Sequence, residues 1–252
     1  MALGIWPVNI FGAPEECLMS IANNIAEVRE RIAAAANRAG RRPEEVALMA
    51  VSKTFPAQAI REAYDSGQRL FGENRVQEFA EKASALGDLV SAEWHLIGHL
   101  QSNKAARAAE LFGAVDSVDS LRLAEKLNAA AQKANKRLPV LIEINVGGEA
   151  AKSGIALGSD ELERLLTAAP RLEVLEFRGL MTIPPFAEDP QQARPYFRKL
   201  RELRDQTAAR HLPSLCLDVL SMGMSHDFEA AIEEGSTCVR VGTAIFGERI
   251  KP

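Results

Sequence analysis

Short apolar runs alternate with longer amphipathic segments along most of the chain, and this alternation is the feature that most constrains the fold. Each run has the length and composition of a buried strand. Repeated alternation of this kind favours a parallel sheet covered by helices. We expect strands near residues 46–51, 69–71, 93–97, 114–118, 138–146, 174–180, 215–221 and 237–241. We expect a first helix capped by Ser20 and ended by Gly40 and Pro43, and further helices over residues 57–66, 76–86, 121–134, 160–169, 190–210 and 228–234.

Eight strands in 252 residues fit a single (β/α)₈ barrel. An open doubly wound sheet is the alternative, but it usually has a glycine-rich phosphate loop after its first strand. Here the first strand runs into Ser52–Pro56, which is not such a loop. We therefore expect one domain over residues 19–252. Residues 1–18 show no clear period and lack signal-peptide features, so we expect a poorly ordered extension and a possible natural start at Met19.

Charge and composition exclude several classes of function. The net charge is -4 and no long basic block is present, which argues against nucleic acid as a main partner. No segment is long and apolar enough to span a membrane. The three cysteines and four histidines show no metal-ligand spacing, and the odd cysteine count suggests a reducing cytoplasm. These residues are Cys17, Cys216, Cys238, His95, His99, His211 and His226.

Lys53 lies at the carboxyl end of the first expected strand, after the apolar run Val46–Val51. Carboxyl ends of the strands form the active face of a barrel of this kind. Desolvation lowers the pKa of a lysine, and a neutral lysine is a good Schiff-base nucleophile. A lysine that extends from the strand end into water is the alternative, and this strand alone favours it.

Two turns and one arginine near the end of the chain indicate a ligand with a phosphate group. Ser221–Ser225 places two hydroxyls and a glycine at an expected strand-to-helix turn, and Gly242-Thr243 follows the last strand. Barrels often bind phosphate after their seventh and eighth strands, although each turn alone is more often only a turn. Arg240 lies in an apolar strand, so it either forms a salt bridge across the barrel or faces a ligand. A phosphorylated aldehyde such as pyridoxal 5′-phosphate would suit both Lys53 and these groups.

Ordered blocks from about residue 19 to the end resemble one family, the pyridoxal phosphate homeostasis proteins (the YggS/PROSC family). The blocks that carry the resemblance are Ala50–Lys53, Phe71–Asn74 with Gln77-Glu78, Trp94–Lys104, Ile144–Val146, Lys152–Gly154, Gly179–Met181, Ser221–Ser225 and Arg240–Gly247.

The resemblance implies a single (β/α)₈ TIM barrel of the fold-type III pyridoxal-phosphate class, like the N-terminal domain of alanine racemase. It implies an internal aldimine, a Schiff base, between Lys53 and pyridoxal 5′-phosphate. It also implies further cofactor-binding residues, which are named next. We expect no catalytic residue and no metal-binding residue. Ser225, Gly242 and Thr243 would hold the phosphate, Ser221 and Met224 would line that end, Arg240 would face the pyridine nitrogen, and Asn74 and His99 would lie near the ring.

The chain departs from the family pattern at Phe55, where the family often has a second lysine two residues after the Schiff-base lysine. This puts in doubt any proton-transfer role for a lysine at that place. Lys152 remains as either a secondary cofactor-handling lysine or a solvated loop lysine.

Three functions suit these residues: a cofactor carrier, a fold-type III racemase or decarboxylase, and a Schiff-base aldolase without cofactor. Racemisation needs acid/base groups on both faces of the substrate. A tyrosine would be the candidate for the second group, but Tyr64 and Tyr196 both fall in expected helices, where core packing is the plainer role. An arginine at the pyridine nitrogen also discourages the protonated ring that most such enzymes use. The aldolase gives Arg240 no clear role. We therefore expect a cytoplasmic, monomeric, non-enzymatic protein that stores, buffers or delivers pyridoxal 5′-phosphate, with apo enzymes as recipients.

Overall fold

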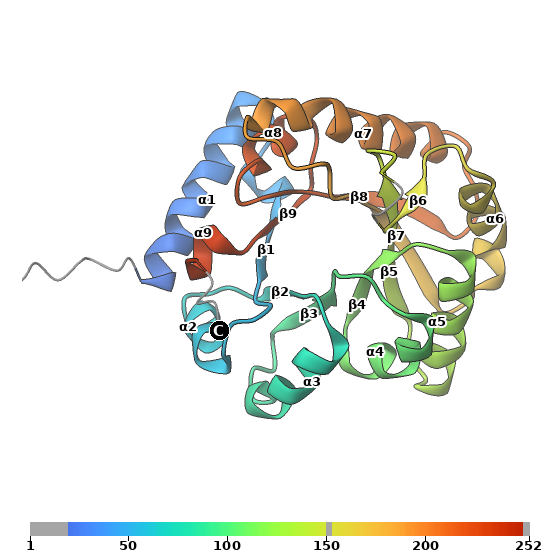
Figure 1. The fold of residues 1–252 in the computed structure, drawn as a ribbon, viewed down its shortest axis with the longest axis horizontal. Helices are drawn as coiled ribbons and strands as arrows, with labels where there is room; N and C mark the ends of the chain where they lie inside the picture. Colours follow the sequence, from blue (N-terminus) through green and yellow to red (C-terminus); the bar gives the residue numbers. More distant parts are fainter. Residues whose placement is uncertain (1–19, 150–152, 249–252) are drawn as a thin grey trace, which may run out of the picture.

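The computed structural model describes residues 20–149 and 153–248. The extension over residues 1–18 and Lys152 lie outside the described residues. Within them, eight parallel strands close into a barrel, because β1 pairs with both β2 and β9 and β4 pairs with β5 (Figure 1). The single-barrel prediction is confirmed. The strands are β1 Ala47–Val51, β2 Leu70–Glu73, β3 Glu93–Leu96, β4 Ala114–Val118, β5 Leu138–Asn145, β7 Leu175–Met181, β8 Leu215–Met224 and β9 Cys238–Val241.

The helices form an outer ring around the strands (Figure 1). They are α1 Ile21–Arg38, α2 Ala57–Asp65, α3 Val76–Ala83, α4 Ala105–Leu111, α5 Leu121–Lys133, α6 Asp160–Ala168, α7 Arg194–Ala208, α8 Phe228–Glu233 and α9 Thr243–Phe246. Short 3₁₀ turns are η1 Pro43–Glu45, η2 Ser84–Leu86, η3 Ser102–Lys104, η4 Ala169–Arg171 and η5 Pro190–Ala193. A two-residue strand, β6 Ile155–Ala156, pairs with the end of β5.

Sequence patterns missed two of the described α-helices and one of the described strands. The buried residues of α4 are the alanines Ala105, Ala108 and Ala109, which are too small to produce a clear hydrophobic period. The helix α9 has four residues and the strand β6 has two, so neither is long enough to show a period.

The first helix begins and ends as its residue types predict. The Ser20 side chain accepts a hydrogen bond from the Asn23 backbone N–H at 3.2 Å, which caps the amino end. Gly40 follows the carboxyl end with φ +67°, a conformation that favours glycine. The buried face of α1 packs beside α8, where Arg31 pairs with Glu229 at 2.8 Å.

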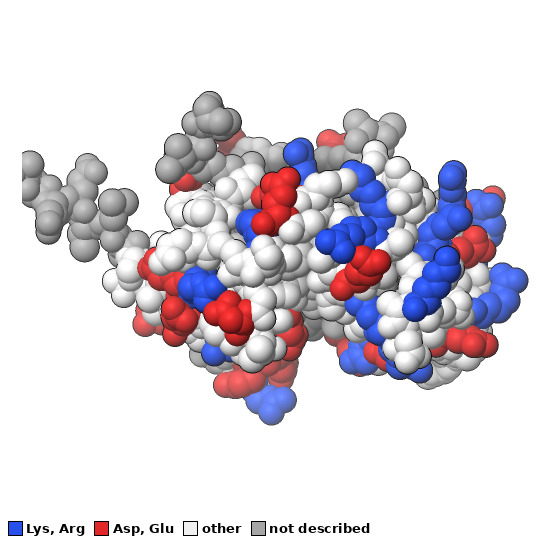
Figure 2. All heavy atoms as spheres, turned by 90° about the horizontal axis from the view of Figure 1, so that it is seen from below, with Lys and Arg blue, Asp and Glu red and all other residues white. Residues whose placement is uncertain are grey.

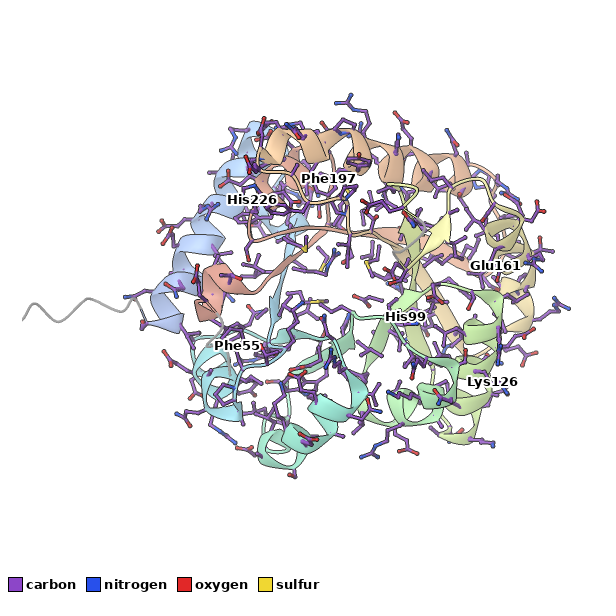
Figure 3. All side chains as sticks on the ribbon, viewed as in Figure 1. Phe55, His99, Lys126, Glu161, Phe197 and His226 are labelled. Carbon is purple, nitrogen blue, oxygen red and sulfur yellow. The ribbon has the colours of Figure 1, made fainter. Side chains whose placement is uncertain are left out.

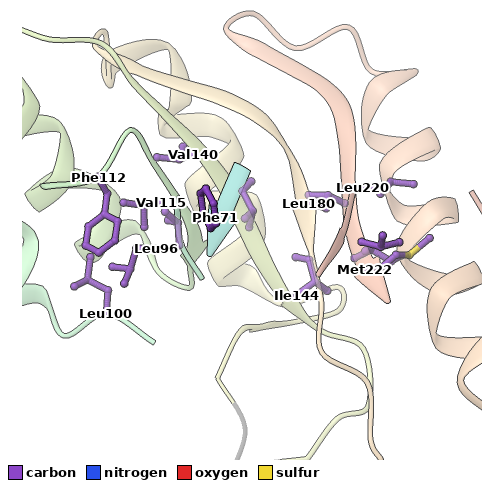
Figure 4. Close-up of a cluster of buried hydrophobic side chains, with 14 of the residues drawn as sticks. Phe71, Leu96, Leu100, Phe112, Val115, Val140, Ile144, Leu180, Leu220 and Met222 are labelled. Atoms are coloured by element: carbon purple, nitrogen blue, oxygen red, sulfur yellow. The ribbon is translucent and has the colours of Figure 1, made fainter. Parts of the chain in front are cut away.

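Strand alternation divides the apolar residues into two groups. The larger group fills the space between strands and helices, and Figure 4 shows part of it around Phe71, Leu96 and Val115. The smaller group lies inside the barrel and contains Met49, Val51, Ile97 and Cys238. Alternate residues of a strand face the same side. A residue two positions along a strand from a member of the smaller group therefore also faces the barrel interior.

Charged side chains of both signs are interspersed on the face of the molecule seen in Figure 2. Arginine and carboxylate side chains form ion pairs on the described surface, such as Arg61–Asp88 at 2.6 Å and Arg210–Glu163 at 2.8 Å. None of the described helices combines the length and the apolar character needed to cross a membrane.

Candidate functional site

The residues singled out in the sequence lie on one end of the barrel. In a closed parallel barrel the carboxyl ends of all strands form one face. The relevant residues lie on or directly after β1, β2, β3, β8 and β9: Lys53, Asn74, His99, Ser221, Met224, Ser225, Arg240, Gly242 and Thr243. The structure therefore brings the whole predicted set to a common mouth.

Arg240 on β9 is buried, with 3% of its surface exposed. Its Nη1 donates to Ser221 Oγ and its Nη2 donates to the Thr182 carbonyl, both at 2.7 Å. Among the described residues, no carboxylate lies within 4.0 Å of its guanidinium, so the salt bridge that the sequence left open is not formed there. An arginine has five N–H donors, and these two bonds leave donors for a ligand.

Burial acts to lower the pKa of the Arg240 guanidinium, while nearby Asp116, Asp227 and Glu143 act to raise it. Arginine remains protonated throughout the range in which proteins fold. The interior of the barrel therefore contains a fixed positive charge.

Glu143 on β5 is a second buried ionisable group, which the sequence interpretation missed. Its Oε2 is enclosed and has no hydrogen-bond partner among the described residues. Burial, followed by the nearby Asp119 carboxylate, raises the pKa of Glu143 to about 7, against the effect of Arg240. The signal that identified Arg240, a charge within an apolar strand, was present here too. Leu141 lines the cavity inside the barrel, and Glu143 lies two residues further along the same strand. The Glu143 side chain therefore also faces the barrel interior.

A hydroxyl and a short helix form the second part of the site. Ser225 Oγ accepts from the backbone N–H of Gly242, at 3.2 Å, and of Ala244, at 3.4 Å. Gly242 is the N-cap residue of α9 and Ala244 lies in its first turn, and the leading N–H groups of a helix have no partner inside it. The two N–H groups converge on the Ser225 oxygen, which has an O–H of its own, and this grouping suits a phosphate.

The turn after β8 differs in detail from the sequence prediction. Ser221 lies within β8, which continues to Met224, and Ser221 binds Arg240. The Met224 N–H donates to Asp227 Oδ1 at 2.6 Å, so this donor is engaged within the turn. Ser225 consequently meets the amino end of α9 rather than that of α8. Gly223 has φ +94°, and a Cβ there would lie 2.6 Å from the Ala231 Cβ, so this turn requires glycine.

Lys53 follows β1 and is half-buried. It lies two residues after Val51, which faces the barrel interior. The Ser52 N–H donates to the Gly72 carbonyl at 3.0 Å, which prolongs the pairing of β1 with β2. Phe55, at the place where the family often has lysine, stacks on Phe246 of α9 with ring centroids 4.9 Å apart. The Lys53 loop thus contacts α9, the helix whose amino end meets Ser225.

Asn74 and His99 line the neighbouring strand ends. The Gly98 backbone packs so closely on Asn74 that a Cβ at Gly98 would lie 2.3 Å from the Asn74 carbonyl oxygen. His99 Nδ1 is 2.9 Å from Asp119 Oδ2, which orients the imidazole, and Figure 3 labels His99 beside the central opening.

His95 on β3 lies deeper in the barrel than His99. Its Nδ1 is 3.1 Å from Asp116 Oδ1. Burial acts to lower the pKa of His95, but the Asp116 carboxylate outweighs burial and raises it. His95 and Cys238 line a cavity of about 350 Å³ formed by the first residues of the strands, at the end of the barrel opposite Lys53.

The donor set at the mouth fits pyridoxal 5′-phosphate. Ser225 and the amino end of α9 could donate to its phosphate, Arg240 could donate to its ring nitrogen, and the Lys53 amine could meet its aldehyde. The phosphate, the ring nitrogen and the aldehyde of the cofactor thus each have a candidate partner on the same end of the barrel.

Comparison with known proteins bears on the fold and on the cofactor. Residues 21–250 match the family described as alanine racemase, N-terminal domain. The pyridoxal phosphate homeostasis protein of Aquifex aeolicus is 47% identical over 231 residues, which cover 92% of this chain and 99% of that protein. The Escherichia coli K12 protein of the same name is 49% identical over 232 residues, covering 91% and 97%.

Solved structures extend the comparison to the fold. PipY of Synechococcus elongatus PCC7942 with PLP bound has a TM-score of 0.78 at 38% identity, covering 90% of this chain and 100% of PipY. Alanine racemase from Corynebacterium glutamicum has a TM-score of 0.64 at 20% identity, covering 91% of this chain and 61% of the racemase. The second similarity shows the shared barrel fold alone.

Proposed function

The chain belongs to the pyridoxal phosphate homeostasis protein family, and from this premise we propose that it binds pyridoxal 5′-phosphate covalently through Lys53 and stores, buffers or delivers it. PipY, at 38% identity, has been solved with PLP bound. The donors at the barrel mouth match the same cofactor group by group. The PipY structure and the donors at the barrel mouth both support binding of the cofactor. We therefore propose that the protein carries the cofactor.

Each group of the mouth has a part in this proposal. Pyridoxal 5′-phosphate supplies an aldehyde, with which a neutral lysine amine condenses with loss of water. Ser225, Gly242 and Thr243 anchor the phosphate, and Met224 and Ser221 line that end. Lys53 provides the amine, and Asn74 and His99 flank the ring. His99 is held in one orientation by Asp119, 2.9 Å away.

The buried guanidinium of Arg240 is the observation that carries the proposal of a carrier rather than an enzyme. It has no carboxylate partner among the described residues, and Ser221 and Thr182 hold it in place. A group that keeps its protons leaves a facing ring nitrogen unprotonated, which makes the bound ring a weak electron sink. The site therefore binds the cofactor well and activates it poorly.

Neither tyrosine of the chain is placed as a second acid/base group. Tyr64 in α2 and Tyr196 in α7 pack against the core from the outer ring of helices. We propose that the protein acts as a monomer and passes its cofactor to apo pyridoxal-phosphate enzymes, since hydrolysis or attack by another amine reverses the attachment to Lys53.

Three assays test this function. Wild-type protein mixed with pyridoxal 5′-phosphate should gain the visible absorbance of the lysine-bound cofactor, and Lys53→Ala should not. Loaded protein should restore activity to an apo enzyme, whereas an equal amount of the Lys53→Ala variant, treated identically and desalted, should not. Alanine racemisation near the median enzyme turnover of about 10 s⁻¹ would contradict the carrier function.

A further inference from the structure

One ammonium group binds the backbone on both sides of Lys53. Lys82, in the last turn of α3, places its Nζ 3.2 Å from the Ser52 carbonyl oxygen and 3.4 Å from the Phe55 carbonyl oxygen. These carbonyls precede and follow the dipeptide Lys53-Thr54. The same Nζ is 2.9 Å from Glu73 Oε1. A single side chain thus joins the Lys53 loop to the end of β2.

This group of residues is enclosed. The Lys82 side chain is 13% exposed and the Glu73 side chain is 0% exposed. Ser52 Oγ donates to Glu73 Oε1 at 2.7 Å, so the same carboxylate oxygen holds both the loop and the ammonium. Burial raises the pKa of Glu73, while Lys82 and then Ser52 act in the opposite direction. Buried ion pairs often stabilise a fold less than apolar residues of similar size, so stability is a weak explanation for this pair.

The loop itself is strained. Thr54 has φ +66°, which is rare for a β-branched residue. Its N–H donates to the Glu78 carboxylate, whose Oε1 is also 3.6 Å from Lys82 Nζ. Strained backbone persists only where neighbouring groups hold it, and here those neighbours are Lys82 and Glu78. Such strain is concentrated at functional sites, and the residue beside it is Lys53.

We propose that Lys82 is a positioning residue, which holds the Ser52–Phe55 loop so that the Lys53 amine is placed to react with the aldehyde of pyridoxal 5′-phosphate. This inference rests on the proposed function. The attachment forms one C=N bond and releases one water, so it needs no oxidant or reductant. Lys82 acts through its bonds to the loop backbone and takes no proton from the reacting atoms.

A purely structural role for Lys82 is the alternative, and a pair of variants separates the two. Lys82→Met removes the ammonium but leaves the Glu73 carboxyl buried without its partner, which is costly. Lys82→Met/Glu73→Gln removes both charges and keeps an acceptor for Ser52 Oγ. The double variant should regain stability, yet it still lacks the bonds to the Ser52 and Phe55 carbonyls. Lys126→Met, at an exposed lysine of α5 labelled in Figure 3, is the matched control.

The test compares two ligands on each variant. The rate of covalent attachment of pyridoxal 5′-phosphate is followed by absorbance and by borohydride trapping. Pyridoxine 5′-phosphate, which has an alcohol instead of the aldehyde, reports phosphate and ring binding alone by calorimetry. For the double variant we expect attachment about 10- to 100-fold slower, the size of effect that a small misplacement of a reacting group produces. Its affinity for pyridoxine 5′-phosphate and the behaviour of Lys126→Met should match the wild type.

Two results would overturn the inference while leaving the proposed function intact. Attachment at the wild-type rate in the double variant would show that Lys82 does not position Lys53. Equal losses of affinity for both ligands, together with a lowered unfolding temperature, would show a structural role only. Failure of the wild-type protein itself to form an adduct would refute the proposed function and the inference that depends on it.

Discussion

Replacing Glu143 with glutamine should change the pH dependence of stability. Glutamine has nearly the shape of glutamic acid but no charge. The pKa of Glu143 is raised from 4.5 to about 7 in the folded protein, first by burial and then by Asp119, with Arg240 acting against them. The folded state therefore keeps a proton that the unfolded state has already lost between these pH values.

The sign and the size follow from proton linkage. Because the folded state binds more protons than the unfolded state between pH 4.5 and about 7, the free energy of unfolding falls as the pH rises through this window. Each pKa unit corresponds to about 1.4 kcal/mol, so ionised Glu143 costs the fold roughly 3 kcal/mol above pH 7. Glu143→Gln removes this cost, and a chain of this size gains about 2–4 °C in unfolding temperature for each kcal/mol.

Denaturant unfolding of both proteins at pH 4.5, 6 and 8 provides the assay. We expect the two free energies of unfolding to agree at pH 4.5 and the variant to become more stable by roughly 3 kcal/mol at pH 8. Taking the difference between the proteins cancels the contributions of the other buried carboxyls, which are Glu73, Asp116, Asp227 and Glu234 among the described residues. A difference that stays constant over the whole pH range would refute the reasoning that burial keeps Glu143 protonated.

Two further substitutions test the phosphate end of the site. Ser225→Ala removes the hydroxyl that meets the amino end of α9; a lost hydrogen bond to a charged group is worth about 1.5–3 kcal/mol, so titration calorimetry should show affinity for pyridoxine 5′-phosphate lowered by about tenfold or more. Gly223→Ala should destabilise the fold by about 1–3 kcal/mol, because its φ is +94° and the new methyl would meet Ala231 at 2.6 Å. Gly87→Ala is the control for the second change, since its nearest neighbours would be 3.8 Å away; equal denaturation curves for both glycine variants would contradict the account of the β8 turn.

The strands were predictable because a barrel strand is buried on both faces and reads as an uninterrupted apolar run. The cap at Ser20 was predictable from local chemistry. The helix α4 was not, because alanine contributes little to a hydrophobic period. Met222, Gly223 and Met224 were expected in a turn but lie in a strand, because β8 continues to Met224. The extent of a strand depends on its neighbours as well as on its own residues.

The candidate site divides along similar lines. Lys53, Arg240 and Gly242-Thr243 were found because strand ends of a barrel share one face, and their roles in holding the cofactor remain predictions. Lys82 could not be found in this way, because its contact with the Lys53 loop depends on how α3 packs against the ends of β1 and β2. Glu143 was open to the same argument as Arg240, since both are charged residues in apolar strands.

The most direct test of the central claim is to find where the cofactor becomes attached. Wild-type protein loaded with pyridoxal 5′-phosphate is reduced with borohydride, digested and mapped by mass spectrometry, with Lys53→Arg as the control. We expect one reduced adduct on Lys53 and none at the corresponding peptide of the control. An adduct confined to a different lysine, or full covalent loading of Lys53→Arg, would contradict the account.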